Sequence, residues 1–103
     1  MLLSDLLERQ VRLTDERLDH ILNDHPEMAD QSERLGETLH NPDTIVRSKT
    51  DNDVELFYKL FASTPVSSKY MCVVLKIKNN DIFIITAYFT DTVKKGAVLW
   101  PSR

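Results

Sequence analysis

Residues 70–90 read YMCVVLKIKNNDIFIITAYFT, and this stretch decides the fold. Two apolar runs flank Asn79-Asn80, and asparagine tolerates the positive φ angles that a two-residue hairpin turn requires. The stretch therefore predicts two antiparallel strands, Tyr70 to Lys78 and Ile82 to Thr90, joined by a tight turn.

The turn also predicts the register of this hairpin. With Lys78 opposite Asp81, the pairs that follow are Leu75 with Ile84, Val73 with Thr86 and Met71 with Tyr88. One face of the hairpin then carries Leu75, Ile77, Ile82, Ile84, Thr86 and Tyr88. The other face carries Cys72, Val74, Phe83, Ile85, Ala87 and Phe89. Because the second set is more uniformly apolar, we expect helices to cover it and Thr86 and Tyr88 to lie on the freer surface.

Further strands are predicted on both sides of the hairpin. Val54 to Phe61 has the two-residue alternation of a strand, and Thr44 to Ser48 is a shorter strand that ends in the turn residues 49–53. Ala97 to Trp100 predicts a fifth strand at an edge of the sheet.

Before Pro42 the apolar residues recur with helical spacing instead. Thr14 is typical of an N-cap, and it begins a predicted helix that ends near Pro26, because proline disfavours helical geometry in the preceding residue. A second helix is predicted over residues 29–40.

The composition suits one domain with one core, since the chain has 103 residues of which 42% are hydrophobic. We expect residues 1–12 to form an N-terminal arm or a short helix. Residues 13–103 are expected to form a single α+β domain, with N-terminal helices packed on a four- to five-stranded antiparallel meander sheet. The only cysteine, Cys72, excludes a disulfide within the chain and favours a reducing, cytoplasmic location. No apolar run approaches the roughly 20 residues of a membrane helix, so we expect no membrane partner.

Charge is divided unevenly along the chain. Residues 1–56 carry a net charge of −8 and residues 57–103 carry +5, which together give the total of −3. A polyanion responds to local potential, so the basic half can present a positive surface to RNA despite the acidic total.

Several kinds of site are disfavoured by residue type and spacing. His20 and His25 are separated by about 140° on an ideal helix, so they cannot form the i, i+4 pair of a helical zinc site. With only Gly36 and Gly96, the chain has no Gly-rich phosphate loop, and Cys72 lies in mid-strand, which is a poor setting for a nucleophile. We expect no metal and no cofactor.

The remaining polar residues suit acid–base cleavage of RNA. Unperturbed histidine titrates near pH ~6.5, so His20 and His25 can serve as base and acid, one taking the 2′-OH proton and the other protonating the leaving 5′-oxygen. Lys59 is a candidate to stabilise the negative charge that grows on the phosphoryl oxygens.

Candidate substrate-binding residues lie on the predicted strands and at their ends. Tyr88 and Tyr58 offer flat faces on which an unpaired base can stack. Arg47 is a candidate by its charge and strand position, and Lys94 and Lys95 form a basic turn.

Five segments of the chain carry a family resemblance. They are Arg17-Leu-Asp-His20-Ile-Leu-Asn-Asp-His25-Pro-Glu27, Asn41-Pro-Asp43, Phe57-Tyr58-Lys59, Ile85-Thr86-Ala-Tyr88-Phe-Thr90 and Lys94-Lys95-Gly96. Over roughly residues 13–100, the sequence resembles the phage-associated branch of the barnase/EndoU/colicin/RelE-like nuclease superfamily. The resemblance implies N-terminal helices on a curved antiparallel sheet and cleavage of RNA without a metal on the open face of that sheet.

Position by position, the resemblance implies catalytic roles for His20, His25, Lys59 and Thr86, and a substrate-binding role for Tyr88. It implies a small metal-independent ribonuclease of the kind found as a toxin or in a mobile element. The expected partners are RNA and an inhibitor or antitoxin protein.

Two other functions remain open. RelE-like toxins are usually basic, whereas this sequence has a pI near 5.5, which fits a non-catalytic protein-interaction module with a degenerate nuclease fold. Its Leu-rich N-terminal arm or an exposed sheet edge would then pair with another protein. The third reading is a small-ligand binder with a pocket between helix and sheet. Convergence of the histidines with Lys59 and Thr86 favours catalysis, and scatter favours the interaction module.

Overall fold

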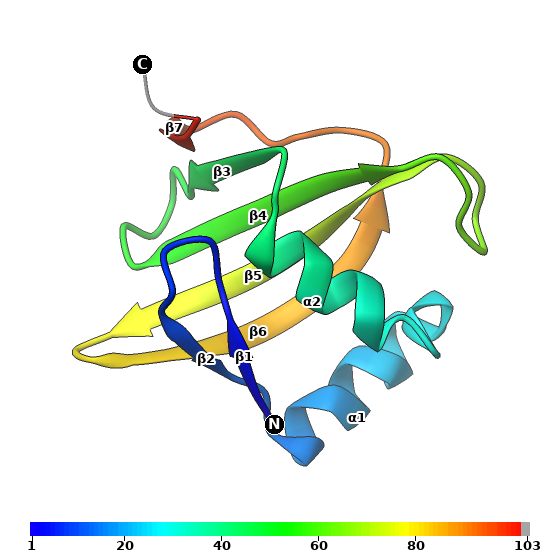
Figure 1. The fold of residues 1–103 in the computed structure, drawn as a ribbon, viewed down its shortest axis with the longest axis horizontal. Coiled ribbons are helices and arrows are strands. Elements are labelled where there is room, and N and C mark those ends of the chain that lie inside the picture. The colour runs from blue at the N-terminus through cyan, green and yellow to red at the C-terminus, as the bar shows by residue number, and fades with distance from the viewer. Residues whose placement is uncertain (102–103) are drawn as a thin grey trace.

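A seven-stranded sheet with its helices on one face forms the structure, a computed structural model that describes residues 1–101 (Figure 1). The elements in chain order are β1 (Leu2–Ser4), β2 (Gln10–Arg12), α1 (Asp15–Asp24), the 3-10 helix η1 (Pro26–Met28), α2 (Ser32–His40), β3 (Thr44–Arg47), β4 (Val54–Phe61), β5 (Lys69–Lys78), β6 (Asp81–Thr90) and β7 (Ala97–Trp100). The strand order is β1-β2-β6-β5-β4-β3-β7. All neighbouring strands are antiparallel except β2 and β6, which pair in parallel through Arg12 and Phe83.

The predicted fold was wrong in the size and type of its sheet. We expected a four- to five-stranded antiparallel meander covered by N-terminal helices, whereas the sheet has seven strands and one parallel pair. The parallel pair arises because the N-terminal segment joins the sheet beside β6. Sequence periodicity gave no sign of this pairing, since a contact between strands so distant in the chain depends on tertiary packing.

Residues 1–12 form the β1–β2 hairpin in place of the expected arm or short helix. The Asp5 carboxylate organises its loop, because Oδ1 accepts hydrogen bonds from the backbone N–H groups of Leu7 and Arg9 at 3.0 and 2.9 Å. The side chain of Val11 is fully buried in the core. Burial of such alternate residues favours strands here, although the leucine spacing is compatible with a helix.

Most of the individual elements downstream lie where the sequence predicted them. The hydroxyl of Thr14 accepts the backbone N–H of Arg17 at 3.1 Å and caps α1, and β4 and β7 have the predicted bounds. The second helix begins only at Ser32, because residues 26–28 form the separate 3-10 turn η1. None of the helices within residues 1–101 is long and apolar enough to cross a bilayer.

A β-bulge changes the register of the β5–β6 hairpin. The strands pair as predicted from the turn as far as Leu75 and Ile84. Beyond this pair, Val74 lies opposite Thr86, so Ile85 is an extra residue in β6. A bulge of this kind reverses the alternation of faces, and every later pair is displaced by one residue from the prediction.

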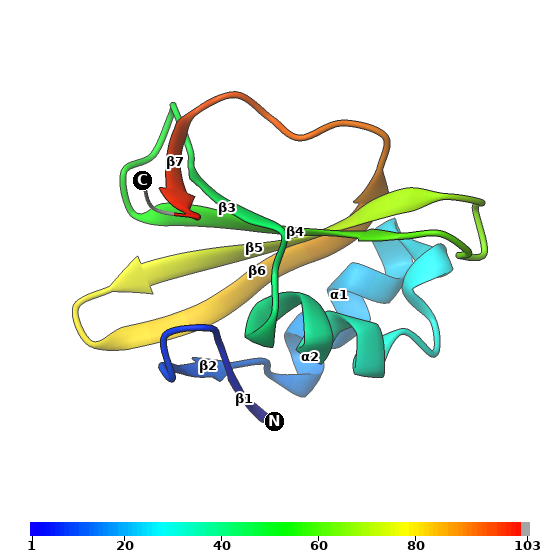
Figure 2. The same ribbon diagram turned by 45° about the horizontal axis from the view of Figure 1, so that its top comes forward.

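The displaced register places the helices on the face that we expected to be free. Their core includes Leu39, Phe57, Met71, Val73, Leu75, Ile84 and Ala87. The opposite side, here called the second face, buries Val46, Leu56, Tyr58, Cys72 and Val74. Residues 91–96, here called the strap, arch over the second face between β6 and β7 (Figure 2). Thr86 and Tyr88 do lie on the second face, away from the helices, but the bulge puts them there and not the predicted pairing.

Candidate functional site

Two segments that are distant in the sequence meet beside β6. His25 follows the last turn of α1, and its ring centroid lies 5.4 Å from that of Tyr88, with the ring planes inclined by 31°. The backbone N–H of His25 donates to the carbonyl oxygen of Ile21 at 2.7 Å, which fixes the end of the helix. Pro26 then turns the chain into η1. The contact brings the His25-Pro26 segment to the strand that carries Thr86 and Tyr88.

A carboxylate orients the His25 imidazole. Oε1 of Glu27 lies 3.4 Å from Nδ1 of His25, and the two side chains are 24% and 34% exposed. With Nδ1 facing a carboxylate, Nε2 is the nitrogen left for a substrate. Glu27 stands within one of the segments quoted for the family resemblance, but sequence reasoning gave it no role; its position two residues after a histidine and a proline was the available signal.

Tyr88 and Thr86 project to the same side of β6, because side chains two residues apart on a strand share a face. Both are partly buried. Burial raises the pKa of Tyr88 strongly, and the neighbouring Cys72 thiol raises it further. The Tyr88 hydroxyl therefore stays protonated throughout the range in which a histidine changes charge.

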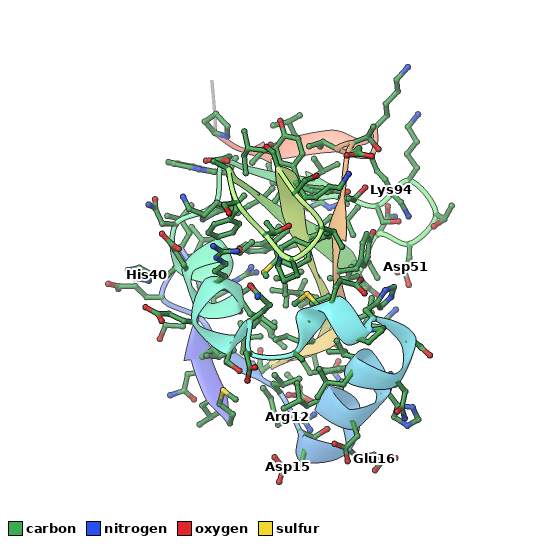
Figure 3. The ribbon with its side chains drawn as sticks, turned by 90° about the vertical axis from the view of Figure 1, so that its right-hand side faces the viewer. Arg12, Asp15, Glu16, His40, Asp51 and Lys94 are labelled. Carbon is green, nitrogen blue, oxygen red and sulfur yellow. The ribbon has the colours of Figure 1, made fainter. Side chains whose placement is uncertain are left out.

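The strap is tied to this face through Tyr58. The backbone N–H of Lys94 donates to the Tyr58 hydroxyl at 3.1 Å, and Figure 3 shows Lys94 on the side of the sheet away from α2. Burial raises the pKa of the Cys72 thiol, an effect that the Tyr88 and Tyr58 hydroxyls and the Lys94 ammonium partly oppose. Lys94 therefore lies close enough to Cys72 to place a positive charge over the second face.

A close approach at Gly96 holds the other end of the strap. A Cβ atom at this position would overlap the carbonyl oxygen of Arg47 and lie 2.7 Å from Cγ1 of Val46. Only glycine allows the strap to meet β3 at this distance. Within residues 1–101, Lys94 and Lys95 form no ion pair, so the strap supplies unneutralised positive charge.

Lys59 lies on the other side of the sheet. It alternates with Phe57 on β4 and therefore projects toward the helices. Its Nζ donates to the carbonyl oxygen of Asn41 at 3.0 Å and lies 3.9 Å from Oδ1 of Asp43. The sheet thus separates Lys59 from Thr86 and Tyr88.

Three other predicted residues also stand apart from His25. His20 is exposed on α1, with Nε2 3.9 Å from Oε1 of Glu16. Arg47 is exposed at the end of β3, which lies three strands away from β6. Tyr58 is fully buried, so its ring has no free face for a base. The predicted residues therefore converge only in part, and the group that meets beside β6 consists of His25, Thr86, Tyr88 and the strap lysines.

No three His, Cys, Asp or Glu side chains gather as a metal-binding group within residues 1–101. No family model matches the chain, and comparisons with curated proteins and with solved structures find no significant similarity. Function is therefore argued from the geometry beside β6 together with the sequence resemblance.

Proposed function

We propose that the chain is a small metal-independent ribonuclease whose reaction takes place beside β6 on the second face. The contact between His25 and Tyr88 carries this proposal, because it joins the two segments that resemble nuclease motifs most closely. An imidazole with a carboxylate at Nδ1 and a free Nε2 is suited to proton transfer. The proposal leaves out His20, Lys59, Arg47 and Tyr58, which lie elsewhere.

In this reaction His25 acts as the general base. Its Nε2 takes the proton of a ribose 2′-OH, the 2′-oxygen attacks the adjacent phosphorus, and the bond to the 5′-oxygen breaks. The leaving 5′-oxygen takes a proton from water, and the product ends in a 2′,3′-cyclic phosphate. The Thr86 hydroxyl and the Lys94 ammonium hold the phosphoryl oxygens, on which negative charge increases in the transition state. Tyr88 keeps the imidazole in place.

The remaining parts of the proposal follow from this activity. RNA is the substrate, and the cytoplasm is the compartment, in keeping with a single unpaired Cys72. A ribonuclease of this kind acts as a toxin or within a mobile element, and an inhibitor or antitoxin protein would control it by covering the second face.

The interaction module remains the second candidate because large apolar side chains are exposed at both edges of the sheet. On the β1–β2 hairpin, Leu2 is 64% and Leu7 is 63% exposed, and on β7 Val98 is 61% exposed. Unpaired strand edges with apolar side chains are typical places for another chain to add a strand.

The deciding experiment incubates the purified protein with total RNA in EDTA and determines the chemistry of the fragment ends. We expect fragments with 2′,3′-cyclic phosphate ends from the parent and from His20→Ala, and none from His25→Ala. His20 is the matched control, since it is an exposed histidine of the same helix. An absence of cleavage by the folded parent would reject the nuclease and favour the interaction module.

A further inference from the structure

A half-open groove lies at the start of α1, beyond the residues assigned to cleavage. It has a volume of roughly 190 Å³ and is lined by Arg12, Thr14, Arg17, Phe83 and Ile84. The guanidinium carbon of Arg12 lies 5.5 Å from the ring centroid of Phe83, and Nη2 of Arg12 lies 2.7 Å from Oδ2 of Asp81. Two arginines therefore line one small depression, and an aromatic ring helps to fix one of them.

The groove and the proposed cleavage site lie along the same edge. Phe83 precedes the bulge at Ile85 and Thr86 follows it, so Phe83, Thr86 and Tyr88 all project toward the second face. At about 3.3 Å per residue, Phe83 and Tyr88 are roughly 16 Å apart along β6. Helix α1 has 10 residues and spans a similar length, about 15 Å, from the groove to His25. The two places are thus opposite ends of one track between α1 and β6.

The charges around the groove leave positive potential for an anion. Arg17 is exposed and forms no ion pair within residues 1–101. The guanidinium of Arg12 has five N–H donors, and its contact with Asp81 uses only part of them. Asp15 and Glu16 stand in the first turn of α1, and Figure 3 shows Asp15 at the outer end of that turn, pointing away from the sheet.

We propose that this groove binds a phosphate of single-stranded RNA a few nucleotides from the bond that is cleaved, with Arg12 and Arg17 as the phosphate ligands. The proposal rests on the ribonuclease function argued above and extends it, because it makes the substrate an extended single strand and not a dinucleotide. Arginine suits this role, since its planar donors match the oxygens of a phosphate in pairs. A strand lying between α1 and β6 would reach Tyr88 at one end and Phe83 at the other.

The test measures binding of a fluorescent octauridylate in the His25→Ala background, which keeps the RNA intact during the measurement. We expect the double variant Arg12→Ala/Arg17→Ala to bind at least tenfold more weakly than the His25→Ala protein. Its plot of log affinity against log salt concentration should be flatter by about 1.4, because each lost contact with a single strand removes about 0.7 from the slope. The matched control is Arg34→Ala, whose guanidinium lies 5.0 Å from the Phe61 ring centroid, outside the groove and the site beside β6, and which should bind like the His25→Ala protein.

Cleavage by proteins that keep His25 separates failure of the groove from failure of the ribonuclease. The loss caused by the double variant should be larger for an octanucleotide than for a dinucleotide, which is too short to reach the groove. If the parent cleaves RNA and the double variant binds and cleaves the octanucleotide equally well, the groove proposal is wrong and the ribonuclease stands. If the folded parent neither binds nor cleaves RNA, both proposals are wrong.

Discussion

The two faces of the sheet are built from different kinds of residue. The helix-covered face is packed with aliphatic side chains and Phe57, and its residues are almost fully enclosed. The second face gathers all three tyrosines of the chain around Cys72, under a strap that carries two lysines. The difference indicates a division of labour, in which one face supplies stability and the other holds the polar groups of the proposed chemistry.

Phe57→Ala should give the largest effect, on stability. The ring is fully buried under the helices, and removing it should lower the free energy of unfolding by about 3–5 kcal/mol. The measurement is urea denaturation followed by circular dichroism. Leu60→Ala is the control on the same strand, since Leu60 is 50% exposed and its loss should cost far less. Equal costs would contradict the assignment of the helix-covered face to stability.

His25→Ala tests the second face. Loss of a general base should reduce kcat for RNA cleavage by about 10²–10⁴-fold while the circular dichroism spectrum stays that of the parent. Lys59→Ala provides the comparison across the sheet and should retain activity within about twofold, because Lys59 contacts Asn41 on the helix-covered side. A Lys59→Ala protein as inactive as His25→Ala would show that catalysis does not belong to the second face alone.

Tyr58 predicts a loss of stability at high pH. Burial raises the pKa of Tyr58 from 10.0 to about 12, so above pH 10 the unfolded chain loses this proton while the folded chain keeps it. Stability is complete below pH 10 and falls up to pH 12, by at most about 2–3 kcal/mol at 1.36 kcal/mol per pKa unit. Denaturation curves between pH 9 and pH 12 should show a smaller fall in Tyr58→Phe than in Tyr70→Phe, which keeps Tyr58. Identical pH profiles for the two variants would argue against this role of Tyr58.

Thr86→Ala should give the smallest effect. A hydroxyl that only positions a phosphoryl oxygen contributes one hydrogen bond, worth about 0.5–1.5 kcal/mol, so kcat/KM should fall by roughly 2- to 10-fold. Thr90→Ala is the control, because Thr90 lies further along β6 and its hydroxyl donates to the carbonyl oxygen of Thr92. A loss as large as that of His25→Ala would mean that Thr86 does more than position the substrate.

Local signals in the sequence predicted local structure well. Thr14 marks the start of α1, Pro26 its end, and the Asn79-Asn80 turn joins β5 to β6. The parallel contact of Arg12 with Phe83 and the bulge at Ile85 were not predictable in this way, because both depend on packing between distant segments.

The candidate site was predictable only as a set of residue types. Strand alternation correctly grouped Lys59 with Phe57, but it could not tell which face of the sheet the helices cover. The contact between His25 and Tyr88 depends on where α1 lies along β6, and nothing in the spacing of either segment specifies that distance.

The bulge at Ile85 gives the chain an unusual evolutionary property. Deletion of this one codon would restore a regular ladder and carry Thr86 and Tyr88 to the side of the sheet under the helices, while the apolar composition of β6 would hardly change. A lineage could therefore lose the proposed activity in a single step and keep a chain that still resembles its ancestors. Among related sequences, the number of residues between the Asn79-Asn80 turn and Tyr88 would separate nucleases from inert descendants better than the identity of any one side chain.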